Sequence, residues 1–512
     1  MKSEHEEIEF KAGLDPEALA TLRKHAALRP HTVGRATTRV LRSIYFDTPS
    51  GRLRDAGLSL RLRRTGHGWT QTLKASRRTK DGLQRVYELN SDAAAPVPNL
   101  DAVPDAAWRK RLRKALKGKP LKPVFETRVR RTSRLLASDQ GEVELAIDTG
   151  RIVSGEAEAP VSEIELELKS GETDAVFDWA RDLLGDQPAR LEQPSKADRG
   201  AALFSGDAPS PPSAIRTSAS PVRGDASAGE AVAALLGFYA AAIARNLHLT
   251  LSRDDPEGPH QLRVALRRLR VLCAASRGVM RSSVRRSLQR RARRLGRIVA
   301  PLRDVDVMTD EIFAPEIADD AAGERLLEAL NTWREKTRAT VRADLLSVRA
   351  TAFAIDLHAL AASGGWRRRS RRGRRRLDAP ARDLAARALE GAWRICALHG
   401  ERFKDLSVSE RHRLRKDLKA LRYAADAFAP AFDGEPPQAF VRAVRRLQNK
   451  LGQLNDLAML ETFDPQLERV LRPAFDTLRE RLVKDCAVRT EAAMDQAIDR
   501  WDALTRAPRY WA

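Results

Sequence analysis

Acidic and basic side chains alternate with apolar residues near the start of the chain. Glu7, Glu9 and Lys11 are spaced two residues apart. In a β-strand this spacing puts all three on one face and the intervening apolar residues on the other. A second segment, residues 163–169, alternates in the same way and places three carboxylates on one face, those of Glu163, Glu165 and Glu167. Such gathered carboxylate oxygens are the ligands that a divalent cation prefers.

Basic segments of the same design lie between these two. Arg61 and Arg63 alternate with leucines, Lys74 follows two threonines at the same spacing, and residues 142–148 add further carboxylates. Two interpretations are open. One is an ordinary solvated sheet face, and the other is a closed barrel whose interior holds a metal on carboxylates and a polyanion on Arg and Lys. Three carboxylates in a row would repel one another without a cation, which favours the barrel.

The pattern Glu7-x-Glu9-x-Lys11 resembles the signature of the CYTH domain, or triphosphate tunnel metalloenzymes. Further motifs follow in the family's order: Tyr45-Phe46-Asp47-Thr48, Leu60-Arg61-Leu62-Arg63, Thr72-Leu73-Lys74, Arg85-Val86-Tyr87-Glu88, Glu163-Ile164-Glu165-Leu166-Glu167 and Ser195-Lys196-Ala197-Asp198-Arg199-Gly200. The resemblance covers residues 1 to about 205. It implies an eight-stranded antiparallel β tunnel that hydrolyses or rearranges triphosphates with Mg²⁺ or Mn²⁺.

The resemblance also implies roles for individual residues of this chain. The metal ligands would be Glu7, Glu9, Glu163, Glu165 and Glu167. The phosphates would bind to Lys11, Arg61, Arg63, Lys74, Arg85, Arg131, Lys196 and Arg199. Catalysis would depend on Glu7, Glu9, Lys11 and Glu165, with a metal-positioned water attacking the terminal phosphorus.

The chain is strongly basic, above all in its C-terminal part. Its 512 residues carry a formal net charge of +23, and the pI is near 10.5. Residues 225–512 hold 54 basic and 38 acidic side chains, a net of +16, whereas the other residues hold 38 and 31, a net of +7. Such an excess indicates a polyanionic partner: nucleic acid, an acidic membrane or polyphosphate.

Cysteine usage and hydropathy favour a cytoplasmic protein. Cys273, Cys396 and Cys486 lie far apart and match no metal-binding spacing, which is typical of free thiols in a reducing compartment. The first residues are acidic, and we find no run of about 18 apolar residues. We therefore expect a cytoplasmic protein without a membrane partner.

Composition and periodicity divide the chain into three parts. Strand-like alternation dominates the first part, residues 206–224 form a linker rich in Gly, Pro, Ser and Ala, and Ala, Leu and Arg then recur at helical spacing. We predict a multidomain α+β protein. Residues 1–205 would form the antiparallel β tunnel with flanking helices, and residues 225–512 an all-α duplicated bundle.

The helical part contains an internal repeat with an offset of 152 residues. His260 is followed by basic residues at +3, +7 and +10, and so is His412. Arg303-Asp304 and Asn455-Asp456 are separated by the same offset, which favours a duplication. The predicted repeats span about 225–365 and 377–512.

Each copy of the repeat forms one stripe along a helix, because positions i, i+3, i+7 and i+10 share a face. The stripes are His260, Arg263, Arg267 and Arg270 in the first copy and His412, Arg415, Lys419 and Arg422 in the second. One interpretation is a solvated basic face. The other, favoured because both copies have the stripe, is a cationic groove between two helices whose self-repulsion is relieved by bound phosphates.

A helical duplication with these stripes resembles the CHAD domain, the conserved histidine α-helical domain. Further matches are Arg268, Arg303-Asp304, Asp306-Val307 and Tyr423, whereas Asn455 departs from the arginine of the first copy. The resemblance covers about 225–512 and implies that the stripes and Arg268 bind inorganic polyphosphate. Metal binding through the histidines is disfavoured, because each lies among several cations.

Residues 367–376 contain eight arginines, interrupted only by Ser370 and Gly373. Such blocks are typical of exposed, disordered segments. We expect a flexible loop between the two helical repeats, with affinity for polyanions as a by-product.

The favoured hypothesis is an inorganic triphosphatase whose helical part binds longer polyphosphate and contacts nucleic acid only nonspecifically. One alternative is a tunnel enzyme for an organic triphosphate, of the adenylate cyclase or thiamine triphosphatase type, although the sequence shows no obvious aromatic pocket for a base. The other is a noncatalytic polyphosphate- or nucleic-acid-binding protein. The clustered carboxylates disfavour it, because a pure polyanion binder has no use for them.

Overall fold

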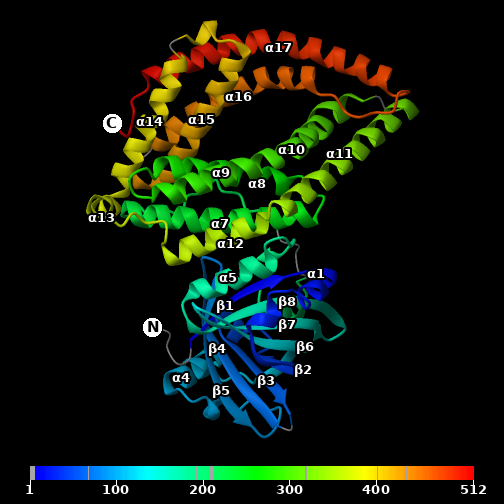
Figure 1. Cartoon of the computed structure of the whole chain (residues 1–512), viewed down its shortest axis with the longest axis vertical. Coiled ribbons are helices and arrows are strands. Elements are labelled where there is room, and N and C mark those ends of the chain that lie inside the picture. The colour runs from blue at the N-terminus through cyan, green and yellow to red at the C-terminus, as the bar shows by residue number, and fades with distance from the viewer. Residues whose placement is uncertain are drawn as a thin grey trace. The chain divides into compact units, whose positions relative to one another are not determined.

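The computed structural model describes residues 6–66, 68–191, 194–207, 213–317, 320–400, 402–432 and 436–512, with only the backbone at a few positions (Figure 1). The chain forms two compact units. The first contains residues 1–213 and 349–363, and the second contains residues 214–348 and 364–512. The segment 349–363, which the predicted boundaries place in the first helical repeat, therefore packs with the N-terminal part.

The first unit is a closed antiparallel barrel. Its strands are β1 (Glu6–Gly13), β2 (Thr32–Asp47), β3 (Ser59–Thr65), β4 (Gly68–Lys80), β5 (Leu83–Ala93), β6 (Lys122–Ser138), β7 (Gly141–Ser154) and β8 (Ala157–Gly171), with the short β9 (Arg190–Leu191) beside β1. The order is β5-β4-β3-β2-β6-β7-β8-β1, and pairing of β1 with β5 closes the ring. The predicted eight-stranded antiparallel tunnel is confirmed.

Alternation along the strands sorts side chains between the two faces of the barrel wall. Leu60 and Leu62 of β3 are fully buried in an apolar cluster with residues of α4 (Ala106–Leu116), outside the barrel. Arg61 and Arg63, one residue along from each leucine, line the internal cavity instead. The wall is thus built as a barrel with a charged interior and helices on its apolar exterior.

The first unit also contains helices, several of which pack against the strands of the barrel. They are α1 (Pro16–Leu22), α2 (Leu28–His31), α3 (Arg52–Asp55), α4, α5 (Thr173–Leu184), α6 (Lys196–Phe204) and α12 (Ala350–Ser363). Phe177 of α5 packs edge-on against Phe10 of β1, with ring centroids 6.3 Å apart. Helix α6 lies so close to β6 that a Cβ at Gly200 would be 2.2 Å from the Phe125 ring. Glycine at this position lets α6 approach the barrel.

Helix α12 belongs to the first unit because it packs on α5. Phe353, Ile355 and Leu357 of α12 are buried. Arg181 Nε of α5 donates a hydrogen bond to Asp356 Oδ1 at 2.7 Å. Thr351 Oγ1 donates to the Gln187 carbonyl at 2.6 Å. Apolar burial and polar contacts therefore fix α12 on the barrel's outer layer.

The second unit is helical (Figure 1). Its helices are α7 (Ala228–Ser252), α8 (Glu257–Ala275), α9 (Ser282–Ile298), α10 (Ala300–Asp306), α11 (Ala321–Ser347), α13 (Arg371–Asp378), α14 (Ala381–Gly400), α15 (Val408–Phe428), α16 (Pro436–Thr462) and α17 (Arg472–Arg506). Short 3-10 or π turns are η1 (Leu100–Ala102) in the first unit and η2 (Val307–Phe313), η3 (Ala314–Glu316), η4 (Phe403–Asp405) and η5 (Ala429–Ala431) in the second. The predicted all-α C-terminal part is confirmed.

Helix α7 contradicts the expectation that no segment is apolar enough to span a membrane. By length and composition it passes such a test, and so does the bent pair formed by α11 and α12. However, 61% of the apolar window of α7 is buried within the protein, where α7 packs against α8, α13 and α14. Burial on this scale is typical of the core helix of a globular domain.

The arginine-rich segment is helical in part, so the prediction of a flexible loop over residues 367–376 was wrong for residues 371–376, which lie in α13. Ser370 caps the N-terminus of α13 by accepting a hydrogen bond from the Gly373 amide at 3.2 Å. Gly373 and Leu377 are buried, and Trp366 before the helix is fully buried. These apolar anchors hold the segment while most of its arginines stay exposed.

Parts of two other predictions lie outside the described residues. Within the predicted linker, residues 208–212 are among those not described, while Ile215 N already donates to Asn246 Oδ1 of α7 at 2.9 Å. The side chains of residues 454–456, where the second helical copy departs from the first, also lie outside the description.

Candidate functional site

A charged cavity of about 190 Å³ lies inside the barrel. Acidic and basic side chains in and immediately behind its wall balance one another. The carboxylates are Glu7, Glu9, Glu88, Glu144, Asp148, Glu163, Glu165 and Glu167. The cations are Lys11, Arg61, Arg63, Lys74, Arg131, Lys169, Lys196 and Arg199. Eight of each sign make the site suited to a ligand that combines anionic and cationic groups.

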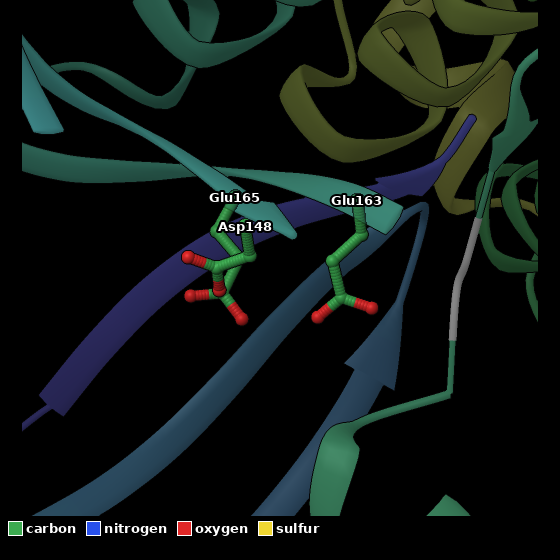
Figure 2. A group of neighbouring side chains, drawn as sticks. All are labelled: Asp148, Glu163 and Glu165. Carbon is green, nitrogen blue, oxygen red and sulfur yellow. The ribbon is translucent and has the colours of Figure 1, made fainter. Parts of the chain in front are cut away.

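Three carboxylates converge at one side of this cavity. Asp148 of β7 and Glu163 and Glu165 of β8 are all buried, and each offers an oxygen within 4.8 Å of the others. Figure 2 shows the three carboxylates pointing to the same side of the sheet. The register explains the convergence, because Asp148 is paired with Glu163 across the two strands, and Glu165 is two residues further along β8.

Basic side chains surround the three carboxylates. Lys196 Nζ contacts all of them, at 2.6 Å from Asp148 Oδ2 and 3.0 Å from Glu165 Oε1 and in a closer contact with Glu163. Lys11 Nζ donates to Glu165 Oε1 at 2.9 Å. Arg131 grips Asp148 with two parallel hydrogen bonds, at 2.8 and 2.6 Å, and also contacts Glu165.

These contacts decide the charge state of the cluster. Burial alone would raise the pKa of Glu165, but the ammonium groups of Lys11 and Lys196 hold it well below its ordinary value. Burial would likewise lower the pKa of Lys196, but the carboxylates, Glu165 first, raise it. Glu165 is therefore ionised at neutral pH, and Lys196 stays charged beside it.

Local structure fixes the cations as firmly as the carboxylates. Lys11 lies directly opposite Glu165 in the pairing of β1 with β8, and Arg131 lies opposite Asp148 in the pairing of β6 with β7. Lys196 is the first residue of α6, whose N-terminus is set by a capping box between Ser195 and Asp198. Strand register and a helix cap thus bring three distant segments to one point.

A second charged group lies on the β1, β4 and β5 side of the cavity. Lys74 Nζ contacts Glu7 at 2.6 Å and Glu88 at 2.5 Å, and Arg61 approaches Glu88 at 3.9 Å. Burial raises the pKa of Glu7 above its ordinary value, Lys74 opposes the shift, and Glu88 reinforces it. Glu9 contacts Lys11 at 3.1 Å and so links this group to the three carboxylates.

Arginines and a tyrosine complete the cavity wall. Arg63 Nε donates to Ser43 Oγ at 3.1 Å. The positive charge of Arg61, together with burial, lowers the pKa of Arg63 to about 10. Burial would raise the pKa of Tyr45, but Arg61 and Arg63 lower it. This wall carries excess positive charge, which an anionic ligand would relieve.

The structure brings most of the sequence-predicted tunnel residues together, but the predicted position of one of them was wrong. Arg85 lies on the outer face of β5, where its half-exposed side chain contacts Glu6 at 3.6 Å. Successive side chains of a strand point to opposite faces, so residues an odd number of positions apart lie on different sides of the wall. Glu88 faces inward, and Arg85, three residues before it, therefore faces outward. Glu167 lines the cavity but contacts Lys169 at 2.9 Å and lies outside the group of three carboxylates.

Three inward carboxylates were missing from the predicted site, namely Asp148, Glu88 and Glu144, the last of which also lines the cavity. Asp148 belongs to the cluster of three, and Glu88 contacts Lys74. Both were within reach of period-two reasoning. Asp148 shares its strand face with Glu142 and Glu144, but the apolar Ala146 interrupts the row.

The chemistry of the three carboxylates fits a divalent cation. Their donors are hard oxygens, which suit Mg²⁺ or Mn²⁺. The ammonium of Lys196 already lies among them, so the position accepts positive charge. Asp148, Glu163 and Glu165 would hold the metal. Glu7 and Glu9 line the same cavity and are oriented by lysines.

A second, more apolar cavity of about 330 Å³ adjoins the charged one. The two share Tyr45, Ser59, Lys74 and Ala197 in their linings. Tyr45 stacks on Phe125 with ring centroids 4.4 Å apart, and Phe46 and Phe204 also line the cavity. No local sequence pattern predicts this aromatic space, because its aromatic residues come from the separate elements β2, β6 and α6.

In the second unit the two predicted stripes meet. Helices α8 and α15 pack together, and we call the cations Arg263, Arg267, Arg415, Lys419 and Arg422 the α8–α15 cluster. Burial, reinforced by the guanidinium groups of Arg415 and Arg267, lowers the pKa of Lys419 to about 7. Charges of one sign are thus held close together across two helices.

Individual members of the first stripe differ in their surroundings. Arg263 contacts Asp304 at 2.9 Å and donates to the Ala300 carbonyl at 3.0 Å, whereas burial and then Arg303 lower the pKa of His260. Arg268, predicted to bind polyphosphate, is buried, contacts Asp426 at 2.8 Å and stacks over Tyr423. That prediction was wrong, because Arg268 lies on the core side of α8 and joins α8 to α15.

Comparison with known proteins adds family assignments to this geometry. Residues 5–201 match the CYTH domain, and residues 234–465 match the CHAD domain. A curated relative, named inorganic triphosphatase, from Haemophilus influenzae is 32% identical over 201 residues. That match covers 39% of this chain and 55% of the relative, so the chain spans about half the length of the curated relative it matches.

Solved structures are similar to each part separately. The CHAD domain from the plant Ricinus communis is 25% identical, with a TM-score of 0.48, covering 58% of this chain and 99% of that one. A second solved structure is a Hippeastrum protein described as a putative adenylyl cyclase with a dominant triphosphatase activity. It is 20% identical, with a TM-score of 0.27, and the match covers 40% of this chain and 97% of that one. From the two family matches, the chain contains an N-terminal CYTH domain followed by a CHAD domain.

Proposed function

We propose that the barrel hydrolyses inorganic triphosphate to pyrophosphate and phosphate with Mg²⁺ or Mn²⁺, and that the CHAD domain binds longer polyphosphate. The observation that carries the first part is the balanced interior, in which a cluster of three buried carboxylates lies beside lysines and arginines. The name of the Haemophilus influenzae relative agrees with it.

The charge balance supports a metal–triphosphate complex as the ligand. Triphosphate alone would meet the repulsion of eight carboxylates, and a metal alone would meet that of eight cations. Together the two neutralise much of each other's charge, so their complex enters without leaving a buried charge uncompensated. A solvated surface or a pure polyanion site has no need of both signs in one closed space.

The residues of the chain would divide the work by position. Asp148, Glu163 and Glu165 would hold the metal, which supplies an activated water and stabilises charge on the phosphate oxygens. Lys196, Lys11 and Arg131, freed from those carboxylates, would turn to the phosphates.

On the opposite wall, Arg61, Arg63 and Lys74 would hold the remaining phosphate oxygens through charged hydrogen bonds. Glu7 and Glu9, fixed by Lys74 and Lys11, would orient the attacking water.

The test is phosphate release by the full chain from triphosphate, longer polyphosphate, ATP and thiamine triphosphate, each with Mg²⁺ or Mn²⁺. We expect turnover to be greatest on triphosphate and to be lost in Glu165→Gln. Ser170→Ala, outside the cavity lining, serves as the control. The proposal fails if the folded protein releases no phosphate from triphosphate with either metal, or if Glu165→Gln retains full turnover.

The adjoining apolar cavity favours a second candidate, hydrolysis of an organic triphosphate. A ring that stacks on Phe125 or Phe204 would occupy it while the triphosphate lies against Lys74. The same panel separates the candidates, since ATP or thiamine triphosphate would then exceed inorganic triphosphate in kcat/KM. Phe204→Ala would lower only the organic activities.

Binding of polyphosphate by the CHAD domain rests on the α8–α15 cluster. Charges of one sign held close together repel one another, and the pKa of Lys419 is lowered first by burial and then by the charges of Arg415 and Arg267. Phosphate oxygens spaced along a chain would remove the repulsion. Cytoplasmic localisation would agree with such a substrate.

A further inference from the structure

Helix α9 presents an unusually basic surface that the predicted stripes do not include. Residues 258–303 contain fourteen arginines and no aspartate or glutamate. Within α9, Leu288, Ala292 and Leu295 are buried and fix one side of the helix in the core. Five exposed arginines occupy the other side, and we call them the α9 face: Arg286, Arg290, Arg293, Arg294 and Arg297.

The α9 face borders a hollow in the protein surface. With Gln289, its five arginines line a hollow of about 630 Å³. None of the five makes an ion pair with any residue in the described part of the chain. Their mutual repulsion is therefore not offset by carboxylates of the protein itself, which indicates an external anion.

The α9 face is continuous with the cations of α8. Helices α8 and α9 pack together, and Arg270 of the first stripe lies near enough to α9 to feel the charges of its arginines. Burial, and then the positive charges of Arg293, Arg267 and Arg297, lower the pKa of Arg270. Arg270 thus lies between the α8–α15 cluster and the α9 face.

The second helical repeat places arginines at corresponding positions. Adding the offset of 152 to Arg290, Arg293 and Arg294 leads to three arginines of α16, each of them exposed. They are Arg442, Arg445 and Arg446. A basic face at matched positions of both repeats is therefore a property of the repeat and is not confined to α9.

We propose that the α9 face is a second contact site for inorganic polyphosphate, reached through Arg270 by chains too long for the α8–α15 cluster alone. The inference rests on the proposed binding of polyphosphate by that cluster. Arg286 and Arg297 are eleven residues apart, so the face spans about 16 Å along the helix. The lining has no aromatic side chain on which bases could stack, so it favours polyphosphate over single-stranded nucleic acid.

The test measures affinity against polyphosphate chain length with the full protein. One variant replaces Arg286, Arg290, Arg293 and Arg297 with Gln. A charge-matched control replaces four exposed arginines of α13 with Gln, namely Arg371, Arg372, Arg374 and Arg375. Circular dichroism and thermal unfolding of both confirm that these surface changes leave the fold intact.

In the wild type and the α13 control, affinity should rise with chain length. In the α9 variant, short chains should bind as in the wild type, whereas long chains should lose about tenfold or more. The slope of log affinity against log salt for long chains should fall by about 3, because four phosphate contacts are lost.

Other outcomes overturn the inference. If the α9 variant keeps the full length dependence, or the α13 control loses as much affinity, the α9 face is not a specific contact site. If duplex DNA displaces long polyphosphate from the wild type at equal concentration of phosphate, the face is a general nucleic-acid surface. If the wild type binds no polyphosphate of any length, the proposed function of the CHAD domain fails first.

Discussion

Lys419 should take up a proton when polyphosphate binds. Burial and the guanidinium groups of Arg415, Arg267 and Arg422 lower its pKa in the free protein to about 7. At pH 8 only about one tenth of the chains then carry the charged form. A bound polyanion compensates the arginines and returns the pKa of Lys419 toward its ordinary value, so the amine becomes protonated.

The magnitude follows from the titration. Binding should take up about 0.9 proton per chain at pH 8 and about 0.1 at pH 6, where Lys419 is already charged. Isothermal titration calorimetry in buffers of different ionisation enthalpy measures this number directly. Affinity should correspondingly fall as the pH rises from 7 to 9.

The matched variant is Lys419→Arg, which keeps the positive charge but does not titrate in this range. It should bind polyphosphate with no proton uptake at pH 8 and with less dependence on pH. His260 is the other titratable group of the first stripe, and its pKa is lowered. Uptake that persists in Lys419→Arg would assign the proton to another group and refute the reasoning. Uptake absent from the wild type would show that the cations of α8 and α15 do not meet the polyanion.

Three further outcomes are expected in the barrel. Arg63→Gln should raise the KM for triphosphate tenfold or more, since a charged hydrogen bond contributes about 1.5–3 kcal/mol. The thermal stability of this variant without ligand should stay equal or rise, because the repulsion between Arg63 and Arg61 is removed. The pKa of Glu165 is depressed in the folded protein, so the contribution of Glu165 to stability is present above its unfolded pKa near 4.5 and is lost as the pH falls below that value. The melting temperature should therefore fall between pH 6 and pH 3, and it should fall less steeply in Glu165→Gln. Phe353→Ala should cost about 3–5 kcal/mol of unfolding free energy in urea titration, whereas a cost under about 1 kcal/mol would show that the Phe353 side chain is not tightly packed.

The barrel was the part of the fold that the sequence predicted best. Period-two alternation in short segments gives both the strands and the side of the wall to which each residue belongs, as Leu60 and Arg61 show. The same rule corrects the site. Arg85 belongs to a family motif, but its parity with Glu88 places it outside. Asp148 lies in a segment whose carboxylates the alternation does predict, although the prediction gives it no role in metal binding.

Helical periodicity identified the stripes but not the surroundings of each cation. Arg267 and Arg268 are neighbours in sequence, yet Arg268 is neutralised by Asp426 in the core and Arg267 faces Lys419. The partner of Arg268 lies 158 residues away on α15, and no local pattern reveals it. Capping and burial likewise turned part of an arginine run, which composition marks as disordered, into α13.

The position of α12 changes how the two domains can be studied apart. A cut in the linker 206–224 separates α12 from α5, because α12 follows α11 in the chain but packs in the first unit. A fragment of residues 225–512 would lack the α5 surface on which α12 packs, and a fragment of residues 1–205 would expose that surface of α5. Loss of binding or activity in either fragment would then report the loss of that packing. Substitutions in the full chain avoid this ambiguity, since they leave α12 on α5 and change only the charged groups under test.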